Sequence, residues 1–155
     1  MAIESDIHVL EGVPTLRMLG REALRILAIG AESRYVPKGE VLFSFGENAD
    51  CGYIIQEGSF RLETKSKLAA DVIVGAGTLL GELALVAETT RPATARANEP
   101  STVIRIPRTL FLKMLEGYPQ AAGVLRDQIV RRAQQMFQDM TGVRTFLDVT
   151  PPPKP

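Results

Sequence analysis

Short apolar runs separated by turn residues fill the middle of this sequence, and they constrain its fold more than any other feature. The runs are EVLFSF, CGYIIQ, EGSFRLET and STVIRIP, and Gly, Asn, Asp and Pro punctuate the segments between them. A further apolar stretch lies near residues 70–74. Runs of this length and spacing are typical of strands in a β-meander, a sandwich or a barrel.

Amphipathic helices are predicted on both sides of this region. Apolar residues recur at three- and four-residue steps over about residues 14–33, which indicates one or two short helices. After Pro107 the apolar period changes from two to about 3.6, first over residues 108–116 and then from about Pro119 to Met140. The longer helix carries an apolar stripe of Ala122, Leu125, Ile129, Met136 and Met140. The fold class is therefore α+β, with helices flanking a central barrel or sandwich.

Composition excludes several classes of function. The 155 residues suffice for one domain, and 18 basic and 18 acidic residues give no net charge that would attract nucleic acid or anionic lipid. No apolar run reaches membrane-spanning length and no signal peptide is evident, so we expect a cytoplasmic protein. His8 is the single histidine and Cys51 the single cysteine. We therefore expect no catalytic residues, no metal site and no enzyme activity.

One pair of charged residues, Glu82 and Arg91, is a candidate binding site for a small ligand. Glu82 opens the apolar segment GELALV, and Arg91 lies nine positions later in RPATARA. A short helix and a returning loop of that length could bring both side chains around one small molecule. Arginine is a forked donor suited to phosphate oxygens, whereas a carboxylate only accepts and suits a sugar hydroxyl. A ligand with one phosphate and one ribose hydroxyl would match both.

Three segments carry a family resemblance. GELAL and RPATARA are similar to the phosphate-binding cassette of cyclic nucleotide-binding domains. KGEVLFSFGENADCGYIIQEGSFRLE resembles the early strands of that family, and STVIRIPRTLFLKMLEGYP resembles its last strand and hinge helix. Together these segments cover about residues 35–120.

The resemblance implies a jelly-roll-like, eight-stranded β-barrel with a short N-terminal helical piece, a cassette helix, and B and C helices at the C-terminus. One domain would then span 1–145, with the barrel at about 34–107, the C-terminal helices at about 108–142 and a Pro-rich disordered tail at 146–155. The family roles assign the ribose 2′-hydroxyl to Glu82 and the cyclic phosphate to Arg91. Backbone and loop contacts would come from Gly81, Leu83, Ala84, Pro92, Ala93 and Thr94.

Further residues have weaker assignments. Val72, Val74 and Leu80 are candidates for the wall that faces the base, although barrel core is the simpler role for each. Arg131, Arg132 and Gln135 lie where a C helix could cap the base. Pro92 departs from the family pattern, because proline lacks the amide hydrogen that Ala, Ser or Thr would offer the phosphate. The missing hydroxyl at Pro92 favours cAMP over cGMP.

The resemblance implies a free-standing sensor of the bacterial-regulator type, with cAMP or cGMP as regulatory ligand and no prosthetic group. Its output would pass through the C helix to an unidentified protein partner or into a homodimer, with no DNA or membrane partner. Two alternatives stay open. The chain could be a degenerate member that serves as an interaction module or binds a cyclic dinucleotide, or it could be a segment of a larger transcription factor, kinase or channel.

Overall fold

The structure is a computed structural model that describes residues 3–64 and 70–119, together with residues 122, 123, 125–128, 130–132 and 134 of the C-terminal segment. Its helices are α1 (Ile3–Glu11), α2 (Pro14–Arg17), α3 (Arg21–Gly30) and α4 (Arg108–Glu116), with one 3-10 turn, η1 (Leu83–Leu85). The strands are β1 (Glu32–Val36), β2 (Val41–Phe43), β3 (Asn48–Ala49), β4 (Cys51–Glu57), β5 (Ser59–Glu63), β6 (Val72–Gly75), β7 (Leu79–Leu80), β8 (Thr89–Thr90), β9 (Thr94–Ala97) and β10 (Ser101–Pro107).

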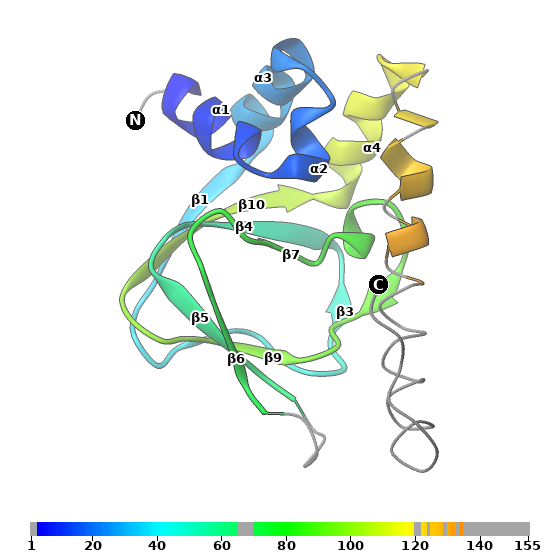
Figure 1. Cartoon of the computed structure of the whole chain (residues 1–155). Coiled ribbons are helices and arrows are strands. Elements are labelled where there is room, and N and C mark those ends of the chain that lie inside the picture. The colour runs from blue at the N-terminus through cyan, green and yellow to red at the C-terminus, as the bar shows by residue number, and fades with distance from the viewer. Residues whose placement is uncertain are drawn as a thin grey trace.

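The strands form two four-stranded antiparallel sheets and a two-stranded pair. One sheet has the order β1-β10-β4-β7, the other has the order β2-β9-β5-β6, and β3 pairs with β8. Figure 1 shows the helices covering the outer face of the first sheet, while the second sheet closes the opposite side. The predicted α+β class and jelly-roll-like architecture are confirmed, with the eight main strands divided between two sheets.

Two hydrophobic cores lie on the two faces of the first sheet. The core between this sheet and the helices contains Leu10, Leu16, Leu24, Leu27, Ile54, Ile104, Ile106 and Phe111. The core between the two sheets contains Val36, Phe43, Tyr53, Ile55, Phe60, Leu80 and Val103. Because successive side chains of a strand point to opposite faces, Ile104 of β10 packs under the helices and Val103 packs between the sheets.

The structure corrects two boundaries of the sequence prediction and defines the type of the cassette helix. The N-terminal helices end at Gly30, and Glu32–Val36 form an edge strand whose first four residues are exposed, so no apolar alternation marks it. Helix α1 precedes the predicted helical region. The cassette helix is the single 3-10 turn Leu83–Leu85.

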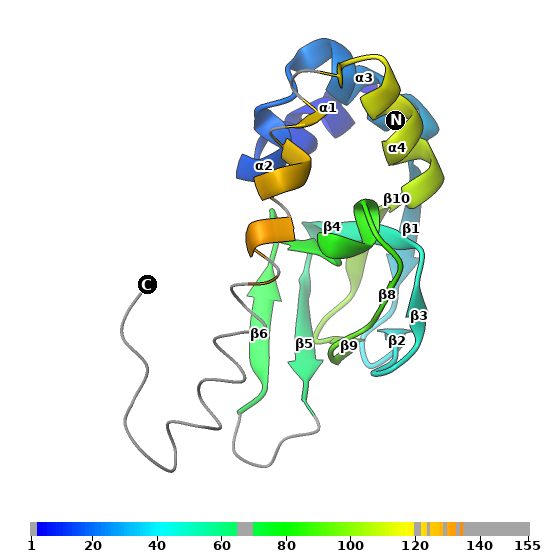
Figure 2. The same ribbon diagram turned by 90° about the vertical axis from the view of Figure 1, so that its right-hand side faces the viewer.

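The beginning of the predicted C helix packs on the domain. Residues 122, 123, 125–128, 130–132 and 134 are helical, and Ala122 and Leu125 are buried in the core beneath the helices. In Figures 1 and 2 the orange residues of this segment lie beside α2. Ile129, Gln135, Met136, Met140 and the predicted tail lie outside the described residues. Among the residues that are described, no helix has the length and apolar character needed to cross a membrane.

Candidate functional site

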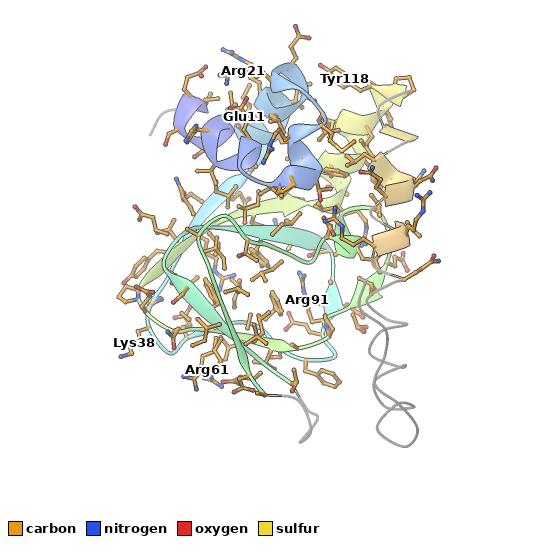
Figure 3. All side chains as sticks on the ribbon, viewed as in Figure 1. Glu11, Arg21, Lys38, Arg61, Arg91 and Tyr118 are labelled. Carbon is orange, nitrogen blue, oxygen red and sulfur yellow. The ribbon has the colours of Figure 1, made fainter. Side chains whose placement is uncertain are left out.

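Arg91 lies between the two sheets with its backbone fixed by the loop after β2. Its amide N–H donates to the carbonyl oxygen of Glu47 at 2.8 Å, and its own carbonyl accepts from the amide of Gly46 at 2.8 Å. Figure 3 shows the side chain pointing into the space enclosed by the strands. Only 4% of the residue is exposed to solvent. An arginine fixed in this way is part of the interior and not a solvated loop cation.

The Arg91 guanidinium is surrounded by aromatic and sulfur atoms. Its central carbon lies 4.4 Å from the centroid of the Phe43 ring and 5.5 Å from that of Tyr53, which are cation–π distances. Nη2 donates to Sγ of Cys51 at 3.3 Å. Nε and Nη1 are buried without a hydrogen-bond partner among the described residues. A buried cation with two unused donors is costly unless an anion reaches it.

The phenol of Tyr53, which lies beside Arg91, has a raised pKa. Burial raises the pKa of Tyr53 above its ordinary value, and a hydrogen bond with Cys51 raises it further, while the positive charges of Arg34 and Arg91 act in the opposite direction. Tyr53 is therefore an uncharged aromatic side chain beside Arg91 at physiological pH and does not neutralise the charge of Arg91.

Gly81 allows the close approach of the cassette to Arg91. Its φ of 83° is in the left-handed region, which glycine adopts without strain. A Cβ at this position would clash with Nη1 of Arg91 and lie 3.1 Å from the carbonyl oxygen of Cys51. The sequence-predicted glycine is thus directly against the guanidinium.

Glu82 faces the helices and not Arg91. Its Oε2 accepts a hydrogen bond of 2.6 Å from Oγ1 of Thr15 on α2 and one of 3.0 Å from Nη1 of Arg132. Its side chain is 18% exposed. The structure therefore brings the cassette backbone to Arg91 but directs the two charged side chains to different neighbours.

The remaining cassette residues surround these two groups. Ala84 is buried and Leu83 is half-buried within η1. On the returning loop, Pro92 is exposed, Ala93 is half-buried, and Oγ1 of Thr94 accepts a hydrogen bond of 2.9 Å from the amide of Phe45.

The candidates for the base-facing wall and the cap are in varied environments. Leu80 is buried between the sheets, Val74 packs at the edge of that core, and Val72 is exposed. Arg131 is exposed, whereas Arg132 contacts both Thr15 and Glu82. Gln135 lies outside the described residues.

Sequence reasoning missed four residues of the site. Phe43, Cys51 and Tyr53 were predicted only as pattern or core positions, and their apolar character gave no sign that they enclose a guanidinium. Thr15 lies 67 positions before Glu82, so no local spacing could connect them.

A surface hollow of about 490 Å³ lies beside β3 and β8. Its lining residues are Asn48, Ala49, Asp50, Glu88, Thr89, Thr90 and Arg108, none of which belongs to the predicted site. Nη1 of Arg108 donates to the carbonyl oxygens of Ala49, Ala84 and Ala87 at 2.9–3.2 Å, so this guanidinium supports the loop. Because Arg91 itself is almost fully buried, a ligand that reaches it must displace covering atoms.

Comparison with known proteins identifies the family of this chain. The sequence profile of the cyclic nucleotide-binding domain matches residues 33–118. The chain belongs to the cyclic nucleotide-binding domain family. The match contains Phe43 of β2, Tyr53 of β4, the cassette and Arg91. This family is in general regulatory and not catalytic.

Solved structures support the same fold. A cyclic nucleotide-binding-like protein from Brucella abortus is 41% identical, with a TM-score of 0.65 over 72% of this chain and 97% of that one. The regulatory domain of Toxoplasma gondii PKA, crystallised with cAMP, is 23% identical with a TM-score of 0.69, over 86% of this chain and 50% of that one. The second likeness is one of fold alone.

Longer curated relatives contain a similar segment. An uncharacterized NTE family protein of Mycobacterium tuberculosis is 31% identical over 137 residues, which is 88% of this chain and 22% of that protein. Lysophospholipase NTE1 of Pyricularia oryzae is 31% identical over 107 residues, or 67% of this chain and 7% of that protein. The chain therefore spans about a fifth or less of the length of these relatives.

Proposed function

We propose that this chain is a cytoplasmic cyclic-nucleotide sensor that prefers cAMP and relays binding through its C-terminal helical segment. The single observation that carries the proposal is Arg91, whose buried guanidinium has two unpartnered nitrogens beside the cassette glycine. A phosphate oxygen would accept a charge-assisted hydrogen bond from either of these nitrogens.

The ribose and base would be bound by the surrounding groups. Glu82 is the acceptor for the ribose 2′-hydroxyl, because a carboxylate can only accept. The absence of a hydroxyl at Pro92 favours cAMP over cGMP. Leu80 and Val74 supply apolar surface between the sheets for the base side of the pocket.

The output runs through the segment that follows α4. Leu125 is buried against the helices and Val130 packs on the same core, so this segment is coupled to the domain that would bind ligand. A nucleotide that alters this packing would expose or rotate the apolar stripe that the sequence predicts for this segment. Self-association or docking to a partner protein would then report the ligand.

Calorimetry on the purified protein with cAMP, cGMP and a cyclic dinucleotide tests the proposal. We expect saturable one-site binding of cAMP that is weakened about ten- to a hundredfold in Arg91→Ala, since a lost charge-assisted contact typically costs about 1.5–3 kcal/mol. Arg61→Ala is the matched control, because Arg61 is an exposed arginine on β5, away from Arg91 in Figure 3. Equal cAMP affinity in folded Arg91→Ala and in wild type would refute the assignment of Arg91 to the site. Tighter binding of the cyclic dinucleotide than of cAMP would mean that the cyclic dinucleotide is the ligand.

A further inference from the structure

Two side chains from distant parts of the chain donate hydrogen bonds to the same carboxylate oxygen of Glu82. Oγ1 of Thr15 and Nη1 of Arg132 both donate to Oε2 of Glu82, at 2.6 and 3.0 Å. Nη1 of Arg132 also donates to Oγ1 of Thr15 at 2.8 Å. The hydroxyl of Thr15 thus accepts from the arginine and donates to the carboxylate. The contact joins helix α2, the cassette and the C-terminal helical segment.

The burial of the group makes this contact specific. Thr15 is 2% exposed, so its hydroxyl must find partners inside the protein. Glu82 is mostly covered, whereas the Arg132 side chain is 50% exposed. Arg132 can therefore leave the carboxylate for water at modest cost, while Thr15 remains in place at the base of the contact.

Resting on the function proposed above, we propose that Thr15 and Arg132 occupy the ribose acceptor in the ligand-free protein and compete with the 2′-hydroxyl of the nucleotide. Oε2 already accepts two hydrogen bonds, so a 2′-hydroxyl that donates to this same oxygen must displace one of them. Arg132 is the donor that is displaced, because it is the exposed member of the group. Its departure frees the C-terminal segment from α2, so ligand occupancy and release of the helix are the same event.

The competition predicts that replacing Arg132 changes the affinity only for a nucleotide that carries a 2′-hydroxyl. In Arg132→Ala, cAMP should bind about two- to fivefold more tightly than in wild type, the scale of a partly exposed ion pair. Binding of 2′-deoxy-cAMP should be the same in both proteins, because that ligand does not need Glu82. Thr15→Val keeps the shape of the side chain and should also favour cAMP selectively.

Calorimetry with both nucleotides on wild type, Arg132→Ala, Thr15→Val and Arg126→Ala tests this prediction. Arg126→Ala is the matched control, since Arg126 is an exposed arginine of the same helical segment that belongs to no assigned part of the site, and it should leave both affinities unchanged. Amide hydrogen exchange of residues 125–132 supplies a second readout. In wild type cAMP should speed this exchange more than 2′-deoxy-cAMP does, and in Arg132→Ala the exchange should be fast without ligand.

The outcomes separate this proposal from the function on which it rests. If Arg132→Ala changes the affinities for cAMP and 2′-deoxy-cAMP by the same factor, or weakens cAMP alone, the competition is wrong while nucleotide binding stands. Weakened cAMP binding would mean that Arg132 assists the ligand, with the ribose on Oε1 of an intact Glu82 contact. If no protein in the set binds either nucleotide, the proposed function and the competition both fail. Binding of cAMP only after removal of Arg132 would support the competition in its strongest form.

Discussion

The guanidinium of Arg91 lies over the ring of Phe43, with 4.4 Å between the guanidinium carbon and the ring centroid. This stacking compensates part of the cost of burying the charge, but it leaves Nε and Nη1 without partners among the described residues. Under the proposed function, Arg91 would serve a bound phosphate better than it serves the stability of the ligand-free protein, and several measurable consequences depend on this difference.

Arg91→Leu should weaken nucleotide binding at least as much as Arg91→Ala, while the ligand-free protein keeps or increases its stability, by up to about 2 kcal/mol, because an apolar side chain removes an incompletely paired buried charge. Urea unfolding without nucleotide measures the change. Arg108→Leu is the matched comparison. Its guanidinium donates to three backbone carbonyls, so its loss should destabilise the protein. If Arg91→Leu is the more destabilising of the two, Arg91 is a structural residue.

Gly81→Ala should lower both stability and nucleotide affinity, since the new Cβ would clash with Arg91 and the backbone has a positive φ. Thermal unfolding and calorimetry measure the two effects. Gly77→Ala separates strain from steric contact, because Gly77 has a φ of 91° and a Cβ added there would meet no atom within 4 Å. Equal losses in the two variants would show that the contact of Gly81 with Arg91 has no influence.

Pro92→Ala should tighten cAMP binding by up to about fivefold, the equivalent of one recovered neutral hydrogen bond of about 1 kcal/mol. Titration calorimetry reports the change, with exposed Pro100→Ala as the control for a general effect of replacing proline. Weaker binding in Pro92→Ala alone would mean that the proline preorganises the loop.

Asp6→Asn should stabilise the protein at neutral pH. Burial raises the pKa of Asp6 above its ordinary value of 3.8, and its Oδ1 has no hydrogen-bond partner among the described residues. Because the folded pKa is the higher one, the native carboxyl contributes stability that is present below 3.8 and is lost as pH rises through the folded pKa. The advantage of the asparagine, which cannot ionise, should therefore grow over that interval.

Urea midpoints of wild type and Asp6→Asn between pH 4 and 8 follow this change. Glu4→Gln is the control at an exposed carboxylate, which pairs with Arg21 at 2.7 Å. A difference between wild type and Asp6→Asn that is constant with pH would contradict the role of ionisation.

Leu125→Glu and Met136→Glu should act differently. Leu125 is buried in the core beneath the helices, so a charge there should lower the melting temperature by several degrees. Met136→Glu should leave the melting temperature unchanged and shift a dimer toward monomer in light scattering. A wild type that is monomeric at every concentration would contradict self-association through this helix.

The sequence predicted the architecture and the two charged residues because both depend on local patterns. STVIRIP alternates like a strand, and GELAL with RPATARA keeps the cassette spacing. The surroundings of those charges could not be predicted in the same way. Glu82 meets Thr15 and Arg132, which are 67 and 50 positions away, and Arg91 meets Cys51 across 40 positions. These contacts follow from how the sheets and helices pack, and no spacing in the sequence encodes them.

The residues that match the family profile are fewer than the residues that bury the first sheet. Signature residues 33–118 begin after α1, α2 and α3, yet Leu10, Leu16, Leu24 and Leu27 of those helices cover Ile104 and Ile106 of β10. A fragment trimmed to the signature would expose to water the part of this apolar face that α1, α2 and α3 cover. We therefore expect the smallest autonomous unit of this chain to include its N-terminal helices, and a hybrid protein that borrows the proposed nucleotide site would need to transfer them with it.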